Sequence, residues 1–337
     1  MFFIYVGLHE QYPDIISYHP LQYSDVKQLS SITPRPYRLS VSTGHQIYRR
    51  AYRSTTFAQG LYRGFRGGNS LIQPAIVRNK FIMDFLAIAL QSGSCGNCIY
   101  IETAGTRLLF DAGLSCIEAE RRLAAHGRDI RNVDAILISH DHYDHVRHAG
   151  ALQRKYNLPL YITRDTLDVS LAKHRLGRMG DISHFNAGDP IRIGEIIIRT
   201  IPTPHDGVDG VIFVVESGAK RLGIMTDLGH VFNGLRREIS GLDAVFIESN
   251  YDPEMLSKGP YPSFLKRRIQ GPGGHISNFE AAELLLSGER LKWACLSHLS
   301  QHNNYPDLAL KTHRSVLADS LTLHLASRTH PTDILTV

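Results

Sequence analysis

Cysteine is scarce in this sequence, with four among 337 residues. A disulfide framework needs a denser, paired set of cysteines, so the composition argues against a disulfide-stabilised secreted fold and favours the reducing cytoplasm. Cys95-Gly96-Asn97-Cys98 has the spacing of a redox or zinc-knuckle motif, but the chain holds no second such pair. We therefore interpret this segment as a glycine-rich turn between two strands.

Long apolar runs are missing as well. A helix that crosses a bilayer needs about 18 or more consecutive apolar residues, and no stretch of this chain reaches that length. We therefore expect no membrane span and no membrane partner. Residues 83–337 are enough for one large domain with a substantial core.

A strong charge of one sign is absent from most of the chain. Residues 1–82 contain ten Lys and Arg against three Asp and Glu, whereas residues 83–337 contain 27 against 29. Because non-specific nucleic-acid binding grows with the number of phosphates neutralised, the larger part lacks the composition for a broad basic surface. Lys266-Arg267-Arg268 is a candidate local patch for phosphates, and the alternative is a set of cations favoured by a helix dipole.

Residues 1–82 also lack a sustained apolar period of 2 or 3.6 residues. We expect them to form a basic, poorly ordered N-terminal extension, with the folded domain at residues 83–337. Met83 directly precedes the first expected core strand, so it is a candidate for the true start of the protein. The alternative is a targeting peptide, although a clear amphipathic helix is missing. N-terminal sequencing of the native protein separates the two.

The most informative segment is His140-Asp141-His142-Tyr143-Asp144-His145, directly after the apolar residues 135–138. Because side chains alternate along a strand, the first two histidines can point the same way. A turn into a helix then returns the second aspartate and the third histidine beside them. The segment predicts a metal site that two ions can share, whereas a histidine-rich surface loop is the plainer alternative.

Three later apolar runs each end near a single residue that can bind a metal. These residues are His205, Asp227 and His298, and each follows a strand-length run. Taken alone, each would be an ordinary loop residue. Together they supply the additional ligands that a catalytic pair of ions requires.

These motifs, with Asp111 in Leu109-Phe110-Asp111-Ala112-Gly113, resemble the metallo-β-lactamase superfamily of binuclear hydrolases, where they occur in the same order. The resemblance implies a mixed α/β fold, a four-layer αββα sandwich with its site along one edge. It also implies that Asp111 lies behind the metal loop and orients a ligand. Several further segments resemble the WalJ/YycJ-like branch, which is linked to nuclease activity: residues 92–98, 203–206, 226–229, 248–250, 274–278 and 298–300.

His275 and His298 both lie downstream of Asp227, so either can complete the site. His298 ends an apolar run, as the other ligands do, whereas His275 follows a Gly-Pro-Gly-Gly stretch and precedes a capping box at Ser277. In tRNA 3′-processing enzymes of the superfamily, a similar Gly-His-Ser loop supplies a histidine that protonates the leaving group. We therefore interpret His298 as a ligand and His275 as a general acid. The alternative for His275 is a structural histidine at a helix start.

The resemblance implies two divalent ions. One ion would be held by three histidines, the other by Asp144 and two histidines, and Asp227 and a water or hydroxide would bridge them. Zn²⁺ suits an all-His/Asp set, and Mn²⁺ or Fe are alternatives. The predicted metal ligands are His140, His142, Asp144, His145, His205, Asp227 and His298. The predicted catalytic residues are Asp144, Asp227 and His275, and the predicted substrate contacts are Asn250, Lys266 and Arg267.

The function expected from these residues is metal-dependent hydrolysis of phosphodiesters in DNA or RNA, of the exonuclease type. A thioester, lactone or β-lactam hydrolase on the same fold is the alternative, and a non-catalytic metal-binding regulator is a further one. The apolar patterning predicts strands near residues 84–91, 98–103, 106–110, 133–138, 159–162, 194–202, 208–216, 220–226, 242–247, 293–297 and 321–325. It predicts helices at residues 115–126, after 145, and near 253–258, 261–269, 277–287 and 308–317.

Overall fold

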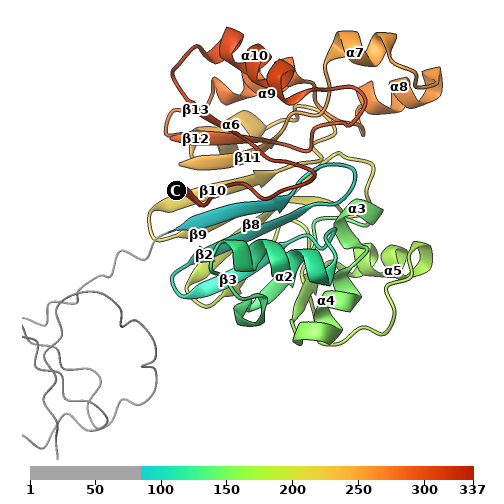
Figure 1. Ribbon diagram of the computed structural model, residues 1–337, viewed down its shortest axis with the longest axis vertical. Helices are drawn as coiled ribbons and strands as arrows, with labels where there is room; N and C mark the ends of the chain where they lie inside the picture. Colours follow the sequence, from blue (N-terminus) through green and yellow to red (C-terminus); the bar gives the residue numbers. More distant parts are fainter. Residues whose placement is uncertain (1–84) are drawn as a thin grey trace, which may run out of the picture. The chain divides into compact units, whose positions relative to one another are not determined.

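The computed structural model describes residues 85–337 (Figure 1). The predicted N-terminal extension at residues 1–82 and the predicted start at Met83 lie outside the described residues and stay predictions. No helix in the described part of the chain is both long and apolar enough to cross a membrane.

Two seven-stranded sheets form the centre of the described domain. In the first sheet the strand order is β14-β1-β2-β3-β4-β5-β6, and in the second it is β13-β12-β11-β10-β9-β8-β7. The first sheet contains β1 (Leu86–Gln91), β2 (Cys98–Thr103), β3 (Thr106–Phe110), β4 (Ala135–Leu137), β5 (Leu160–Ile162), β6 (Ile182–His184) and β14 (Leu335–Thr336). The second contains β7 (Ile191–Ile193), β8 (Ile196–Pro202), β9 (Val211–Ser217), β10 (Lys220–Met225), β11 (Ala244–Glu248), β12 (Trp293–Ser297) and β13 (Thr322–Leu325).

Each sheet combines an antiparallel and a parallel part. In the first sheet β3, β4, β5 and β6 are parallel neighbours, and in the second β10, β11, β12 and β13 are. Residues that follow parallel neighbours emerge at the same edge of a sheet, which is where open α/β sheets bind ligands. Asp111, the predicted metal loop, Asp227 and His298 follow β3, β4, β10 and β12. His205 follows β8, which runs in the same direction as β10 because both pair antiparallel with β9, so this topology gathers the predicted site residues at one edge.

Helices cover the outer faces of the two sheets. The helices beside the first sheet are α2 (Cys116–Ala125), α3 (Tyr143–Val146), α4 (Ala149–Tyr156) and α5 (Arg164–Lys173), with the short 3-10 helix η1 (Ile130–Asn132) before β4. Those that follow strands of the second are α6 (Leu235–Ser240), α7 (Pro253–Lys258), α8 (Ser263–Gln270), α9 (Asn278–Leu285) and α10 (Pro306–Leu317). In Figure 1, α2, α4 and α5 lie on one side of the stacked sheets and α9 and α10 on the other.

Three apolar cores confirm the predicted αββα layering. One lies between the sheets, where Phe110 meets Phe213 with ring centroids 5.1 Å apart. A second lies between the first sheet and α2, α4 and α5, and a third between the second sheet and α6, α9 and α10. Alternation along β2 sends Ile99 and Ile101 to the inner core and Tyr100 to the outer one, as a strand with both faces covered requires.

Candidate metal centre

The predicted metal loop connects β4 to α3 and is fixed from behind by Asp111. The Asp111 carboxylate is buried and accepts the backbone N–H of Ser139 at 2.8 Å and the Ser139 hydroxyl at 2.9 Å. It also lies 2.8 Å from His145 Nδ1. Because Nδ1 is engaged with a carboxylate, His145 presents Nε2 to the site, which is the orienting contact expected at a metal-bound imidazole.

Asn97 fixes the loop from a second side. Its backbone N–H donates to the Asp144 carbonyl at 2.8 Å, and its side-chain Nδ2 donates to Asp144 Oδ2 at 3.0 Å. The Asn97 Oδ1 accepts the Gly93 N–H at 2.8 Å, which sets the orientation of the amide. Gly113 packs against the same strand end, where a Cβ atom would stand 1.8 Å from the Asp144 carbonyl oxygen. Only glycine therefore fits at the third position of Asp111-Ala112-Gly113.

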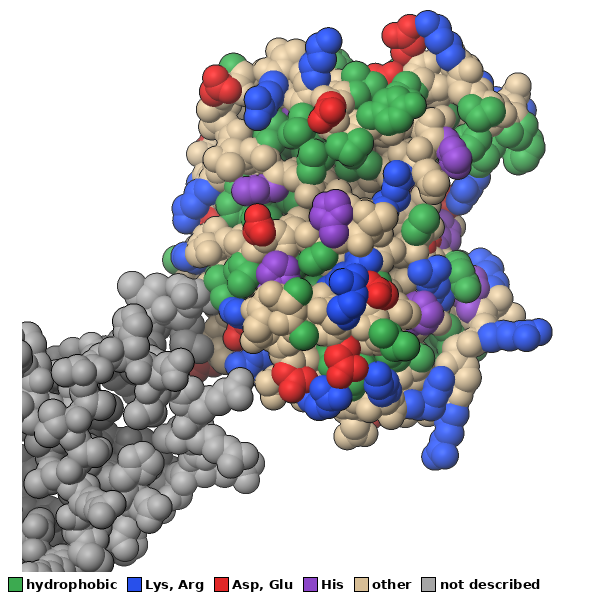
Figure 2. Space-filling model, viewed as in Figure 1, with side chains coloured by type: hydrophobic (Ala, Val, Ile, Leu, Met, Phe, Trp, Pro, Cys, Tyr) green, Lys and Arg blue, Asp and Glu red, His purple; other side chains and the backbone are tan. Residues whose placement is uncertain are grey.

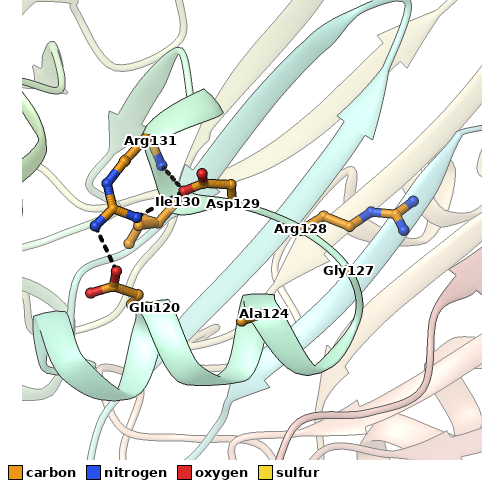
Figure 3. Close-up of a pocket in the computed structure, with 7 residues that line it drawn as sticks. All are labelled: Glu120, Ala124, Gly127, Arg128, Asp129, Ile130 and Arg131. Atoms are coloured by element: carbon orange, nitrogen blue, oxygen red, sulfur yellow. Dashed lines mark hydrogen bonds and ion pairs between the residues drawn. The ribbon is translucent and has the colours of Figure 1, made fainter. Parts of the chain in front are cut away.

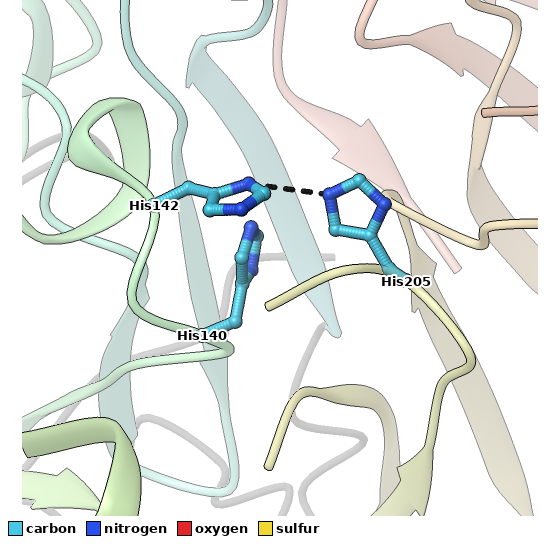
Figure 4. Close-up of side chains that lie close together, drawn as sticks. All are labelled: His140, His142 and His205. Carbon is cyan, nitrogen blue, oxygen red and sulfur yellow. Dashed lines mark hydrogen bonds between the residues drawn. The ribbon is translucent and has the colours of Figure 1, made fainter. Parts of the chain in front are cut away.

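The first cluster of possible ligands consists of His140, His142 and His205 (Figure 4). Their ligand atoms lie within 4.8 Å of one another, and His205 Nε2 is 3.2 Å from His142 Nδ1. His205 Nδ1 donates to the Gly274 carbonyl at 2.7 Å, so its Nε2 faces the other two rings. The structure therefore brings these three imidazoles together, and their binding of a metal stays a prediction.

The second cluster consists of Asp144, His145 and His298. Asp144 Oδ2 lies 3.5 Å from His145 Nε2 and 3.4 Å from His298 Nε2. Asp227 lies between the clusters, because it groups with His140 and His145, and its Oδ1 is 3.5 Å from His205 Nε2. All seven predicted ligands thus lie in overlapping groups that Asp227 joins, and one of these groups, with Asp227 and His298, also includes Glu248 and His275.

Three of the strand-end residues have left-handed backbone conformations. The φ angles are 64° at Asp111, 58° at Asp227 and 54° at His298. Non-glycine residues with positive φ are uncommon, and such strain persists where the surrounding structure enforces it, often at functional sites. The turn that follows β3, β10 and β12 in each case directs a polar side chain into the same place.

The electrostatic balance of the centre favours a cation. Burial opposes the charged form of Asp227, but the neighbouring His298 and His145 outweigh that effect and hold the pKa of Asp227 well below its usual value. Burial also lowers the pKa of His298, yet the carboxylates of Asp227 and Asp144 raise it to about 10. In the first cluster, burial and the other imidazoles lower the pKa of His142 to about 4, which leaves a neutral ring suited to metal binding.

Two buried polar atoms at the junction of the clusters lack a hydrogen-bond partner: His140 Nε2 and Asp227 Oδ2. Asp227 Oδ2 is 3.2 Å from His145 Nε2, but the contact lacks hydrogen-bond geometry. A buried polar atom without a hydrogen-bond partner destabilises the folded state by about 1–3 kcal/mol, so a bound ligand at this position would be favourable. A nitrogen and a carboxylate oxygen are ligands that divalent transition metals accept, and the residues therefore fit a pair of metal ions.

His275 stands beside both clusters and is held by Glu248. The His275 Nδ1 lies 2.7 Å from Glu248 Oε1, and its ring centroid is 4.9 Å from that of His205 and 5.3 Å from that of His298. Glu248 is fully buried and also accepts the backbone N–H of Ile276 at 3.1 Å. Burial opposes its charged form, but His275 outweighs that and lowers the pKa of Glu248 to about 2. With Nδ1 engaged, Nε2 is the nitrogen that His275 offers to a substrate.

A family model described as "Beta-lactamase superfamily domain" matches residues 106–295, which include all seven predicted ligands except His298. The chain belongs to this superfamily. It is 34% identical over 234 residues to "Exodeoxyribonuclease YycJ" of Bacillus anthracis, a match that covers 68% of this chain and 88% of that protein. It is 36% identical over 235 residues to "Exodeoxyribonuclease WalJ" of Streptococcus pneumoniae serotype 2, covering 68% and 87%.

A solved structure supports the fold independently. The metallo-beta-lactamase fold protein YhfI from Bacillus subtilis aligns with a TM-score of 0.57 at 16% sequence identity and covers 74% of this chain and 99% of that one. The αββα architecture and the branch assignment expected from the sequence are therefore confirmed for this superfamily member.

The predicted substrate contacts lie in different environments. Asn250 is 6% exposed, and its amide donates to the His298 carbonyl at 2.9 Å, a contact inside the site. Lys266 and Arg267 lie on α8, where Lys266 Nζ donates to the Ser257 carbonyl at 2.6 Å. Figure 2 shows Lys and Arg mixed with Asp and Glu over the face that it views. Substrate binding by the three residues stays a prediction.

Sequence reasoning left three supporting residues without a role. Asn97 lies in the segment interpreted as a turn, and neither Glu248 nor Asp206, which adjoins His205, is among the predicted site residues. Asp206 Oδ1 lies 3.2 Å from His142 Nε2, and Arg268 binds its carboxylate at 2.7 and 3.0 Å. All three residues stand in motifs that resemble the WalJ/YycJ-like branch, and that position was the available signal.

A separate pocket lies away from this centre, between the end of α2 and η1 (Figure 3). Since η1 precedes β4 and the metal loop follows it, the pocket is at the opposite end of that strand. Its charged groups are already paired: Arg131 lies 2.7 Å from Glu120 and 3.2 Å from Asp129, and Arg128 lies 2.9 Å from Glu102. The pocket therefore offers no free charge for a ligand.

Proposed function

We propose that this superfamily member is a metal-dependent phosphodiesterase of the exonuclease type that acts on nucleic acid. The observation that carries the proposal is a pair of ligand clusters that Asp227 joins, beside a carboxylate-held histidine, His275. The similarity to two exodeoxyribonucleases over more than four fifths of their length supports DNA as the substrate, and RNA is the alternative.

In this proposal the seven converging residues hold two divalent ions. His140, His142 and His205 would hold one ion, Asp144, His145 and His298 would hold the other, and Asp227, which lies between the two clusters, would serve as a further ligand. Zn²⁺ suits a set of ligands that are all imidazole nitrogens and carboxylate oxygens, and Mn²⁺ or Fe are alternatives. When bound, a pair of ions of this kind supplies an activated water and neutralises charge on a phosphoryl oxygen. Asp111 and Asn97 keep the loop ligands in place.

His275 supplies the proton for the departing oxygen. Glu248 holds Nδ1 at 2.7 Å, which fixes the orientation of the imidazole and leaves Nε2 to donate the proton. Proton transfer from Nε2 to the 3′ or 5′ oxygen of the leaving nucleotide leaves His275 neutral and Glu248 still ionised. Glu248 thus orients the general acid and does not itself exchange the proton.

The location that fits this activity is the cytoplasm. Cys95, Cys98, Cys116 and Cys295 are all free thiols in the structure, as expected of a protein from a reducing compartment. Fractionation of cells that express the protein tests this, since recovery outside the cytoplasm would contradict it.

The direct test is an assay of the full chain with end-labelled single- and double-stranded DNA and RNA. The protein is stripped of metal and reloaded separately with Zn²⁺ and Mn²⁺, beside a His140→Ala variant prepared identically as a guard against contaminating nucleases. We expect metal-dependent degradation that the variant loses. If a preparation with two bound ions leaves every nucleic acid intact, the proposal fails, and thioester, lactone and β-lactam substrates become the next to assay.

A further inference from the structure

Tyr143 is an exposed aromatic residue inside the metal loop. It is the first residue of α3 and stands between His142 and Asp144, and 58% of its surface is accessible to solvent. Its neighbours in the loop are different, since His140 and His145 are buried. The loop therefore turns one large aromatic ring outward at the point where it turns its metal-binding groups inward.

Two anchored side chains support this ring. The Arg147 guanidinium lies 5.4 Å from the Tyr143 ring centroid, and it donates to the Gly113 carbonyl at 2.8 Å and the Cys95 carbonyl at 2.5 Å. The ring of His174, which directly follows α5, lies 5.4 Å away at an interplanar angle of 58°, and its Nε2 donates to the Asp141 carbonyl at 2.8 Å.

These supports exceed what a helix surface pair requires. A Tyr and an Arg four residues apart on a helix can contact each other without any further partner. Here both supporting side chains are tied to backbone carbonyls of separate loops, so the ring is held in one orientation while most of it stays in water. An aromatic surface fixed in advance binds a flat ligand with little loss of conformational entropy.

We propose that Tyr143 is a stacking platform for an unpaired nucleobase adjoining the phosphodiester that is cut. This inference rests on the proposed function and specifies its substrate as a single-stranded end. Adjacent Cα atoms are about 3.8 Å apart, so the ring begins one residue from two predicted ligands. Bases along one strand rise by about 3.4 Å, so a base stacked on Tyr143 would lie within a few nucleotides of the phosphodiester at the metal centre.

Stacking on an aromatic ring requires a free base face, which a base inside a duplex does not offer. It is also tolerant of sequence, since every base has a π face. The platform therefore makes the enzyme prefer single-stranded ends, and it distinguishes nucleotides with a base from abasic ones while leaving base identity unread.

The test compares the metal-loaded full chain with Tyr143→Ala and Tyr143→Trp on two end-labelled single-stranded DNAs. The second DNA is identical except for abasic residues at the terminal two positions. Leu286→Ala is the control, because Leu286 is a similarly exposed apolar residue, 60% accessible, at the end of α9. Bound metal is measured for every protein.

We expect Tyr143→Ala to lower kcat/KM on the normal DNA about tenfold or more and to leave the abasic DNA unchanged, with full metal content. Tyr143→Trp and Leu286→Ala should stay within about threefold of the parent protein. The platform would be refuted if Tyr143→Ala had an equal effect on both DNAs, had no effect on either, or lost its metal. In each of these cases, DNA cleavage by the parent protein would still support the proposed function. Failure of the parent protein to cleave any nucleic acid would refute both.

Discussion

The two sheets contribute to the metal centre in different ways. The first sheet contributes a contiguous loop after β4, in which four predicted ligands lie within six residues. The second contributes single residues, His205, Asp227 and His298, after three separate strands. Side-chain hydrogen bonds from Asp111 and Asn97 fix the loop, whereas the residues after β10 and β12 are aimed by left-handed backbone turns.

Because of this difference, mutations in the two parts of the site should have different effects on metal binding. A loop held by side chains can shift as a unit when one support is lost, so such changes should weaken metal binding in steps. A residue at the end of a buried strand is oriented by its own backbone and cannot shift in this way. Only substitution of that residue itself should then remove its contribution to metal binding. Loss of a supporting side chain should therefore reduce metal binding less than loss of a ligand does.

The largest effect is expected at Asp227, which contacts both clusters. Asp227→Asn removes a negative charge from a fully buried position between the histidines, so the protein should bind fewer than two ions and lose at least about 1,000-fold in activity. Metal analysis and nuclease rates measure both. Retention of two ions and of most activity would show that Asp227 is not shared between the metals.

The second effect is expected at the proton donor. General acid catalysis contributes about 10²–10⁴-fold, so His275→Ala should reduce kcat on DNA by that factor and leave metal content intact. A phosphodiester with a p-nitrophenolate leaving group needs no such proton, and its hydrolysis should be little changed. If both substrates suffer equally, His275 acts on the metals or on folding instead.

The third effect is expected at the support behind the loop. Asp111→Asn weakens the contacts to Ser139 and His145 and should lower metal affinity about 10–100-fold. Asp243→Asn is the matched control, because this buried carboxylate accepts the Arg221 N–H at 2.9 Å at a strand start outside the clusters. Competition with a chromogenic chelator reports both affinities, and equal losses would indicate general destabilisation.

The smallest effect is expected at Ala104, a residue with a strained backbone in a turn outside the site. Ala104 has a φ of 49° in the turn between β2 and β3, outside the metal centre. Ala104→Gly relieves this conformation and should stabilise the protein by about 0.5–1 kcal/mol without changing nuclease activity. Urea denaturation checks the first expectation. A destabilised variant would mean that the left-handed turn carries no strain.

Much of the fold was predictable because its strands are buried apolar runs. The strands predicted at residues 98–103 and 106–110 and the helix at 253–258 match β2, β3 and α7. The patterning missed α5, α6, β6, β7 and β14. The strands among these have two or three residues, too few to show a period, and the N-cap of α6 is Gly234, which has no side chain to cap the helix.

The site divides in the same way. Its metal-binding residues were predictable, because His and Asp after apolar runs have a recognisable chemistry. Among the supports, the role of Asp111 was implied by the family resemblance. The contacts of Asn97 with Asp144 and of Glu248 with His275 were not predicted, because these residues are 47 and 27 positions apart. Contacts over such separations depend on how distant segments pack together, so the motifs that contain these residues do not show which partners they contact.

The central prediction is that residues from the two sheets jointly hold two metal ions. Anomalous diffraction from crystals of the Zn²⁺-loaded protein, recorded on both sides of the zinc absorption edge, tests it directly. We expect two peaks, one against His140, His142 and His205 and one against Asp144, His145 and His298, with Asp227 in contact with both. A single peak, or two peaks elsewhere on the protein, would contradict the account.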